Sequence, residues 1–126
     1  MKKIIILLLL MALPVQAKHE FKEKEYQNYW CNLNGGIMEY KLDDNTRVDC
    51  LTDKLAVEFD FAPKWSECIG QALYYGKKTH RTPACVLILE KPEDIRYFYR
   101  LKYTVTEKKK IKNFKMFTID PVLLQK

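Results

Sequence analysis

Three carboxylates lie close together in the sequence, Asp49, Glu58 and Asp60. Side chains of this type bind hard divalent cations. Apolar and polar residues alternate around them, which predicts two strands, Arg47–Thr52 and Leu55–Phe61. A two-residue turn between these strands sets Asp49 directly opposite Glu58. The Cβ atoms of such a pair are about 5 Å apart, so two carboxylates repel unless a cation or a proton lies between them. The pattern therefore predicts a site for Mg²⁺ or Mn²⁺ with these three residues as metal ligands.

A structural explanation of the same residues stays open. The register that pairs the two strands also sets Arg47 opposite Asp60, and an exposed ion pair of this kind contributes only about 0 to 1 kcal/mol. Glu39, on the preceding predicted strand, is a further acidic candidate. With a four-residue loop at 43–46, we expect Glu39 to point away from Asp49.

Lys64 and Gln71 lie on a predicted helix that begins near Pro63 and ends at Gly76. Apolar residues recur along it at helical spacing and predict its buried side: Trp65, Cys68, Ile69, Ala72 and Leu73. Another face carries Lys64, Glu67, Gln71 and Tyr74 or Tyr75. Lys64 falls in the first turn, where a helix attracts phosphate, so a phosphodiester would meet Lys64 and the metal together. The alternative is that Lys64 and Gln71 are ordinary residues of a solvated helix surface.

In combination, these segments resemble the PD-(D/E)XK nuclease superfamily, and its RecB-like branch in particular. The matching pieces are VD at Val48–Asp49, EFD at Glu58–Asp60 and QALYY at Gln71–Tyr75. The resemblance implies a restriction-endonuclease-like core in which Asp49 and Glu58 bind magnesium, and it raises the prospect of a homodimer. Members of the family carry a catalytic lysine two residues after the glutamate, where this chain has Asp60 instead.

Two functions follow from this resemblance. The first is a secreted or periplasmic metal-dependent nuclease that hydrolyses the phosphodiester bonds of DNA or RNA. Asp60 would then be a third metal ligand or a base for water, Gln71 would position substrate, and Lys64 or Arg47 would replace the missing lysine. The alternative is a catalytically inactive module of the same fold that binds nucleic acid or an envelope protein.

The first residues have the pattern of a secretory signal peptide, with two lysines, an apolar run from Ile4 to Leu13 and a small residue at Ala17. The apolar run is shorter than the roughly 20 residues that span a bilayer. We expect a signal peptide at 1–17, one domain at 18–126, a periplasmic or secreted location, and no membrane attachment after cleavage. An uncleaved anchor is the alternative.

Four cysteines fit an oxidising compartment: Cys31, Cys50, Cys68 and Cys85. They allow three complete pairings, among which we prefer Cys31 with Cys50. Cys68 lies on the predicted buried side of its helix and Cys85 opens an apolar strand, so these two are equally well explained as core thiols. The spacing of the cysteines and the two histidines is not that of a zinc site.

The net charge of +6 is compatible with a polyanionic partner such as nucleic acid. Three groups of residues are candidates to contact it: Lys108, Lys109, Lys110 and Lys112; Lys77, Lys78, His80 and Arg81; and Tyr97, Tyr99 and Tyr103 interleaved with Arg96, Arg100 and Lys102. The alternatives are solvated loops for the two basic groups and half-buried packing residues for the tyrosines.

The remaining pattern predicts an α/β fold with a mixed central sheet flanked by helices, in the order α-β-β-β-α-β-α-β. Beyond the elements named above, we expect a helix at Glu20–Leu33, strands at Ile37–Leu42, Ala84–Glu90 and Asn113–Asp120, and a helix from Lys91 to about Tyr103. The unbroken apolar run of Ala84–Glu90 suits a central strand that is covered on both faces. The chain between the strands at Leu55–Phe61 and Ala84–Glu90 should form a right-handed crossover.

Overall fold

The computed structural model describes residues 18–107 and 111–125, and the predicted signal peptide and Lys108–Lys110 lie outside this part of the chain. The elements follow one another as α1 (Glu23–Leu33), β1 (Ile37–Lys41), β2 (Arg47–Leu51), β3 (Leu55–Phe61), η1 (Ala62–Lys64), α2 (Trp65–Thr79), β4 (Thr82–Ile88), η2 (Pro92–Asp94), α3 (Ile95–Thr106), β5 (Lys115–Ile119) and η4 (Pro121–Leu124). The short 3₁₀ helices η1, η2 and η4 are additions to the predicted order.

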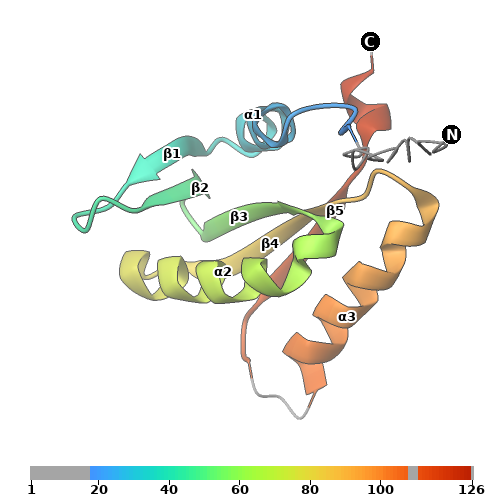
Figure 1. Ribbon diagram of the computed structural model, residues 1–126. Coiled ribbons are helices and arrows are strands. Elements are labelled where there is room, and N and C mark those ends of the chain that lie inside the picture. Colours follow the sequence, from blue (N-terminus) through green and yellow to red (C-terminus); the bar gives the residue numbers. More distant parts are fainter. Residues whose placement is uncertain (1–17, 108–110, 126) are drawn as a thin grey trace, which may run out of the picture.

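One five-stranded sheet has the order β1-β2-β3-β4-β5 (Figure 1). β1, β2 and β3 form an antiparallel meander, whereas β4 pairs parallel with β3, and β5 pairs parallel with β4. Such parallel pairs need long connections, which α2 and α3 supply here. The expectation of a mixed sheet flanked by helices is confirmed, and β4 is the buried strand that its apolar run predicts.

Helices cover the sheet on both sides (Figure 1). α1 packs on one face through Tyr26 and Cys31, against alternate residues of β3 and β4 such as Phe59 and Val86. α2 and α3 pack on the other face, where Cys68 and Leu101 meet Leu87 of β4. The period of two along β4 therefore divides its side chains between two cores.

The predicted end of α2 at Gly76 is wrong, because the helix continues to Thr79 and ends at His80, whose backbone is left-handed with φ 55°. Gly76 lies inside the helix for a different reason. A Cβ atom there would come within 3.0 Å of the Arg81 carbonyl oxygen and 3.1 Å of Pro83. The glycine therefore allows the chain that leaves the helix to fold back against it.

The buried side of α2 also differs from the prediction in two positions. Tyr75 is buried and Leu73 is 37% exposed. Tyr75 packs with Val48 of β2 and Ala56 of β3, where the β1–β2 hairpin passes over this helix. Its position depends on that tertiary contact, which the period of α2 alone does not encode.

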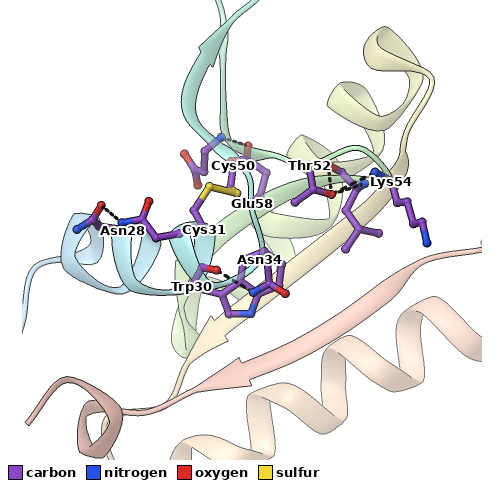
Figure 2. Close-up of a disulfide and its surroundings, with 11 residues drawn as sticks. Asn28, Trp30, Cys31, Asn34, Cys50, Thr52, Lys54 and Glu58 are labelled. Atoms are coloured by element: carbon purple, nitrogen blue, oxygen red, sulfur yellow. Dashed lines mark hydrogen bonds between the residues drawn. A yellow bond between two sulfur atoms is a disulfide. The ribbon is translucent and has the colours of Figure 1, made fainter.

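Two disulfides are present, Cys31–Cys50 and Cys68–Cys85. The preferred pairing of Cys31 with Cys50 is confirmed, and it joins α1 to β2 (Figure 2). The second bond joins α2 to β4 and decides between the two explanations of Cys68 and Cys85. Both bonds are compatible with an oxidising or extracellular location. In the described part of the chain, no helix has the length and apolarity needed to cross a membrane.

Candidate metal and phosphate site

The predicted register of the β2–β3 hairpin is present. Cys50 pairs with Val57, and the Thr52 N–H donates to the Leu55 carbonyl oxygen at 2.9 Å, so Asp49 lies opposite Glu58. Beyond Cys50 and Val57 the regular ladder ends, and β3 continues alone along β4.

Carboxyl groups replace the missing ladder bonds between the strands. The Asp49 N–H donates to Glu58 Oε1 at 3.1 Å, and the Phe59 N–H donates to Asp49 Oδ2 at 2.8 Å. Figure 2 shows Glu58 next to the Cys31–Cys50 disulfide, where the first of these bonds is drawn. The two acidic side chains are therefore held between the strands and do not extend into solvent.

The Asp49–Glu58 pair favours the protonated state. Burial raises the pKa of Glu58 far above that of an ordinary glutamate, and the Asp49 charge raises it further. Burial also raises the pKa of Asp49, against the hydrogen bond from Phe59, and the two carboxyls hydrogen-bond each other. A proton shared by the pair relieves the repulsion that the sequence predicts.

Asp60 is 9% exposed, and its Oδ2 is buried without a hydrogen-bond partner. Burial raises its pKa from 3.8 to about 7, and the charges of Glu23, Glu67 and Asp49 add to the effect, whereas Lys64 opposes it. A buried acceptor without a donor costs about 1 to 3 kcal/mol, so this oxygen is a coordination or hydrogen-bonding position that the chain itself leaves open.

The structure contradicts the predicted orientation of Glu39. The β1–β2 turn has three residues, 43–45, because the Leu42 N–H donates to the Thr46 carbonyl oxygen at 2.8 Å. The pairs Met38–Cys50 and Tyr40–Val48 then place Glu39 opposite Asp49, whose pKa the Glu39 charge raises. The one-residue change in register reverses the face that the side chain occupies.

Glu39 also has a left-handed backbone, with φ 52° in the middle of β1. This conformation is costly for a residue that has a Cβ atom, and it interrupts the ladder between two regular pairs. Strained positions of this kind concentrate at functional sites.

Glu23 of α1 is a further acidic member that the sequence analysis missed. Burial raises its pKa from 4.5 to about 7, with an added contribution from the Asp49 charge and an opposing one from Lys64. In the sequence, Glu23 has only the pattern of an acidic residue in the first turn of a helix. Its place beside Asp49 and Asp60 depends on how α1 packs on the sheet.

Of the predicted phosphate-binding residues, Lys64 lies at the cluster. It ends η1, directly before α2, and its charge lowers the pKa of both Glu23 and Asp60. Gln71 is exposed, two turns further along α2 and one turn beyond Glu67 on the same face. The structure therefore brings Lys64 to the carboxyls and leaves Gln71 at the rim.

The predicted pairing of Arg47 with Asp60 is wrong. Arg47 is exposed and pairs with Lys41 of β1, whereas Asp60 pairs with Leu87 of β4. The strands separate before the register reaches these two residues. Arg47 therefore does not supply the positive charge at the carboxyl cluster, and Lys64 does.

The tip of the β1–β2 hairpin is fixed to α2 by polar bonds. The Tyr74 hydroxyl donates to Asp44, and Lys78 Nζ lies 2.9 Å from Asp43 Oδ1. Hydrogen bonds from Thr46 and Tyr74 lower the pKa of Asp44 to about 2. These contacts hold the hairpin over α2, with the buried Tyr75 beneath it.

Within residues 18–107 and 111–125, no group of three His, Cys, Asp or Glu side chains is arranged so that it could hold a metal ion. One oxygen of Asp49 and one of Glu58 accept backbone bonds, so a cation would have to replace the shared proton and turn the side chains. Carboxylates are the side chains that Mg²⁺ and Mn²⁺ prefer as ligands in proteins. Comparisons with protein-family models, curated proteins and solved structures find no match for this chain.

Proposed function

We propose that this protein is a secreted or periplasmic metal-dependent nuclease that hydrolyses the phosphodiester bonds of DNA or RNA. The observation that carries the proposal is the convergence of Asp49, Glu58 and Asp60 at the point where β2 and β3 separate, with Lys64 beside them. Buried carboxyl groups with pKa values raised together are characteristic of functional sites.

The fold also supports the proposal that the chain has a restriction-endonuclease-like core. α1 is followed by the meander β1, β2 and β3, then by α2 and the parallel strand β4. The resemblance to PD-(D/E)XK nucleases implies a helix, three strands, a helix and a strand, and here the short helix η1 is inserted between β3 and α2. Asp49 and Glu58 lie on the second and third strands of the meander.

Asp49, Glu58 and Asp60 would hold a Mg²⁺ or Mn²⁺ ion, which when bound lowers the pKa of water and neutralises charge on a phosphate. Lys64 carries a positive charge to the same place, and its ammonium would contact a phosphate oxygen. Asp60 has a free oxygen to accept a proton or bind the ion. Gln71, at the rim, would contact the substrate strand.

The test is cleavage of labelled single- and double-stranded DNA and RNA by the mature chain with Mg²⁺ or Mn²⁺. The inactivating variant is Asp49→Asn/Glu58→Gln, because each amide keeps an oxygen for the backbone bonds from Phe59 and Asp49. Asp53→Asn, at the exposed turn of the same hairpin, is the matched control. We expect cleavage by wild type and control, and a loss of at least about 100-fold in the double variant.

Cleavage that persists in the double variant would contradict the assignment of the site. If cleavage is lost in the double variant, Lys64→Ala tests the relocated lysine. We expect a loss of cleavage of about 10²- to 10³-fold in a chain that still folds, since Lys64 is exposed.

The alternative is a catalytically inactive module of the same fold that binds nucleic acid or an envelope protein. It is favoured by one observation, the carboxylate of Asp60 where the resemblance requires a lysine. The two functions differ in cleavage, and also in thermal stability. A nuclease site gains stability when Mg²⁺ or Mn²⁺ is added, whereas an inactive module that has lost its metal does not.

A further inference from the structure

The outward side of α3 carries two arginines and two tyrosines in one stripe. Arg96, Tyr99, Arg100 and Tyr103 follow one another at spacings of three, one and three residues, which is one face of a helix. Tyr99 is 61% exposed and Tyr103 is 67% exposed. We call these four residues the α3 stripe.

The opposite side of α3 explains why the helix presents these residues outward. Leu101 and Val105 are buried in the core that α2 and β4 share, and Phe98 packs against it. The stripe is therefore fixed in orientation by apolar packing, and the exposed tyrosines contribute little to that core.

Both arginines are held in place by one aromatic ring. The Arg96 guanidinium lies 4.8 Å from the centre of the Tyr97 ring, and that of Arg100 lies 5.2 Å from it. Arg96 also donates to the Tyr97 hydroxyl at 3.0 Å. A guanidinium has five N–H donors, so each arginine keeps donors for an anion.

The charge of α3 has one sign. The helix contains Arg96, Arg100 and Lys102 and no acidic residue, and the nearest acidic neighbours in sequence are Asp94 and Glu107 at its ends. α3 also packs against η1, the segment that ends in Lys64. The positive charge of α3 therefore belongs to an element that contacts the segment of Lys64.

We propose that the α3 stripe binds single-stranded nucleic acid, with bases stacked on Tyr99 and Tyr103 and phosphates bound by Arg96 and Arg100. The proposal rests on the proposed nuclease function and extends it to the class of substrate. Residues four positions apart are about 6 Å apart along a helix, which suits successive unpaired bases. Bases in a duplex are already stacked on one another and are closed to the tyrosine rings.

A second copy of this chain is a poorer occupant of the stripe. Self-association through α3 would bring the arginines of one copy close to those of the other. Like charges in contact cost free energy, whereas a phosphate backbone neutralises both arginines.

The experiment measures binding of fluorescent single strands of about 12 nucleotides, DNA and RNA, and of the matching duplex. It uses the mature Asp49→Asn/Glu58→Gln chain in chelator, so that cleavage does not interfere. Tyr99→Ala/Tyr103→Ala should raise the Kd for single strands by at least about 10-fold. The matched control, Tyr29→Ala/Tyr40→Ala, removes two tyrosines that are 38% and 39% exposed elsewhere and should leave the Kd unchanged.

Salt dependence tests the arginines separately. Arg96→Gln/Arg100→Gln should reduce the slope of log Kd against log salt by about 1.4, since each phosphate contact on a single strand contributes about 0.7. The tyrosine variant should keep the slope of the parent. This difference separates stacking from charge, and a general loss of folding would not produce it.

Unchanged single-strand affinity in the tyrosine variant, or tighter binding of duplex, would overturn the proposal. So would a dimer in solution that the same variant dissociates, because the stripe would then be a surface between copies. The proposed nuclease function is tested separately. It fails if wild type does not cleave nucleic acid with Mg²⁺ or Mn²⁺ while the α3 stripe still binds single strands. Comparing the DNA and RNA arms identifies which strand the stripe prefers.

Discussion

The metal-free protein should lose stability as the pH rises from about 4 to about 7, and Asp60→Asn tests this prediction. The pKa of the Asp60 carboxyl is 3.8 in an unfolded chain and about 7 in the folded protein. The native state therefore holds a proton that the unfolded chain has released. Stability from this group is complete below about pH 4 and is lost as the pH rises through about 7.

The size of the effect follows from that difference. Each tenfold change in proton affinity is worth about 1.4 kcal/mol, so the full change for Asp60 is about 4 kcal/mol. Lys64 and Glu67, which influence its pKa, are exposed, and solvent there screens the charges. We therefore expect Asp60→Asn to gain roughly 2 kcal/mol over wild type at pH 8 and to match it near pH 4.

The assay is urea unfolding in chelator at a series of pH values, followed by the fluorescence of Trp30 and Trp65. The chain with Asp60 and the Asp60→Asn variant are both compared in a His19→Gln background. His19 is removed because its ring contacts Glu90 and its charge lowers the pKa of Glu23. A wild-type stability that is constant or increases between pH 5 and 8 would refute the reasoning, as would a parallel curve for Asp60→Asn.

Three further changes test the scaffold, each by the free energy of unfolding in urea. Cys31→Ala/Cys50→Ala opens a bond between residues 19 apart and should cost about 3 kcal/mol; a loss below 1 kcal/mol would mean that the bond constrains little. Gly36→Ala should cost about 1 to 3 kcal/mol, because its Cβ would clash with Cys50 Sγ and lie 2.8 Å from Cys31 Sγ; wild-type stability would contradict that packing. Glu39→Gly should gain about 1 kcal/mol by relieving the left-handed backbone, and a net loss would show that the carboxyl contributes more than the strain costs.

The sequence was sufficient for those features that local patterns determine. Alternation and a two-residue turn predicted the register that sets Asp49 opposite Glu58, and the unbroken apolar run predicted that β4 is an interior strand buried on both faces. The Cys31–Cys50 bond agreed with the preferred pairing. Neighbouring residues specify the register and the buried strand, whereas the disulfide joins residues 19 apart in the chain.

Features that depend on a single backbone conformation or on packing were missed. Asn45 adopts a left-handed conformation, φ 67°, that closes a three-residue turn, and this moved Glu39 to the face of Asp49. Glu23 joined the cluster only through the packing of α1. Arg47 lies away from the carboxyl cluster because β2 and β3 separate after Cys50 and Val57. The alternation of apolar and polar residues does not reveal where two strands separate.

The proposed metal site requires that the buried carboxyls exchange their protons for a divalent metal ion. Titration of Mn²⁺ by calorimetry, repeated in buffers with different ionisation enthalpies, measures both the ion bound and the protons released. Wild type should bind Mn²⁺ with proton release at about pH 6.5, and Asp49→Asn/Glu58→Gln should bind none. Absence of binding by folded wild type at millimolar Mn²⁺, or equal binding by the double variant, would contradict it.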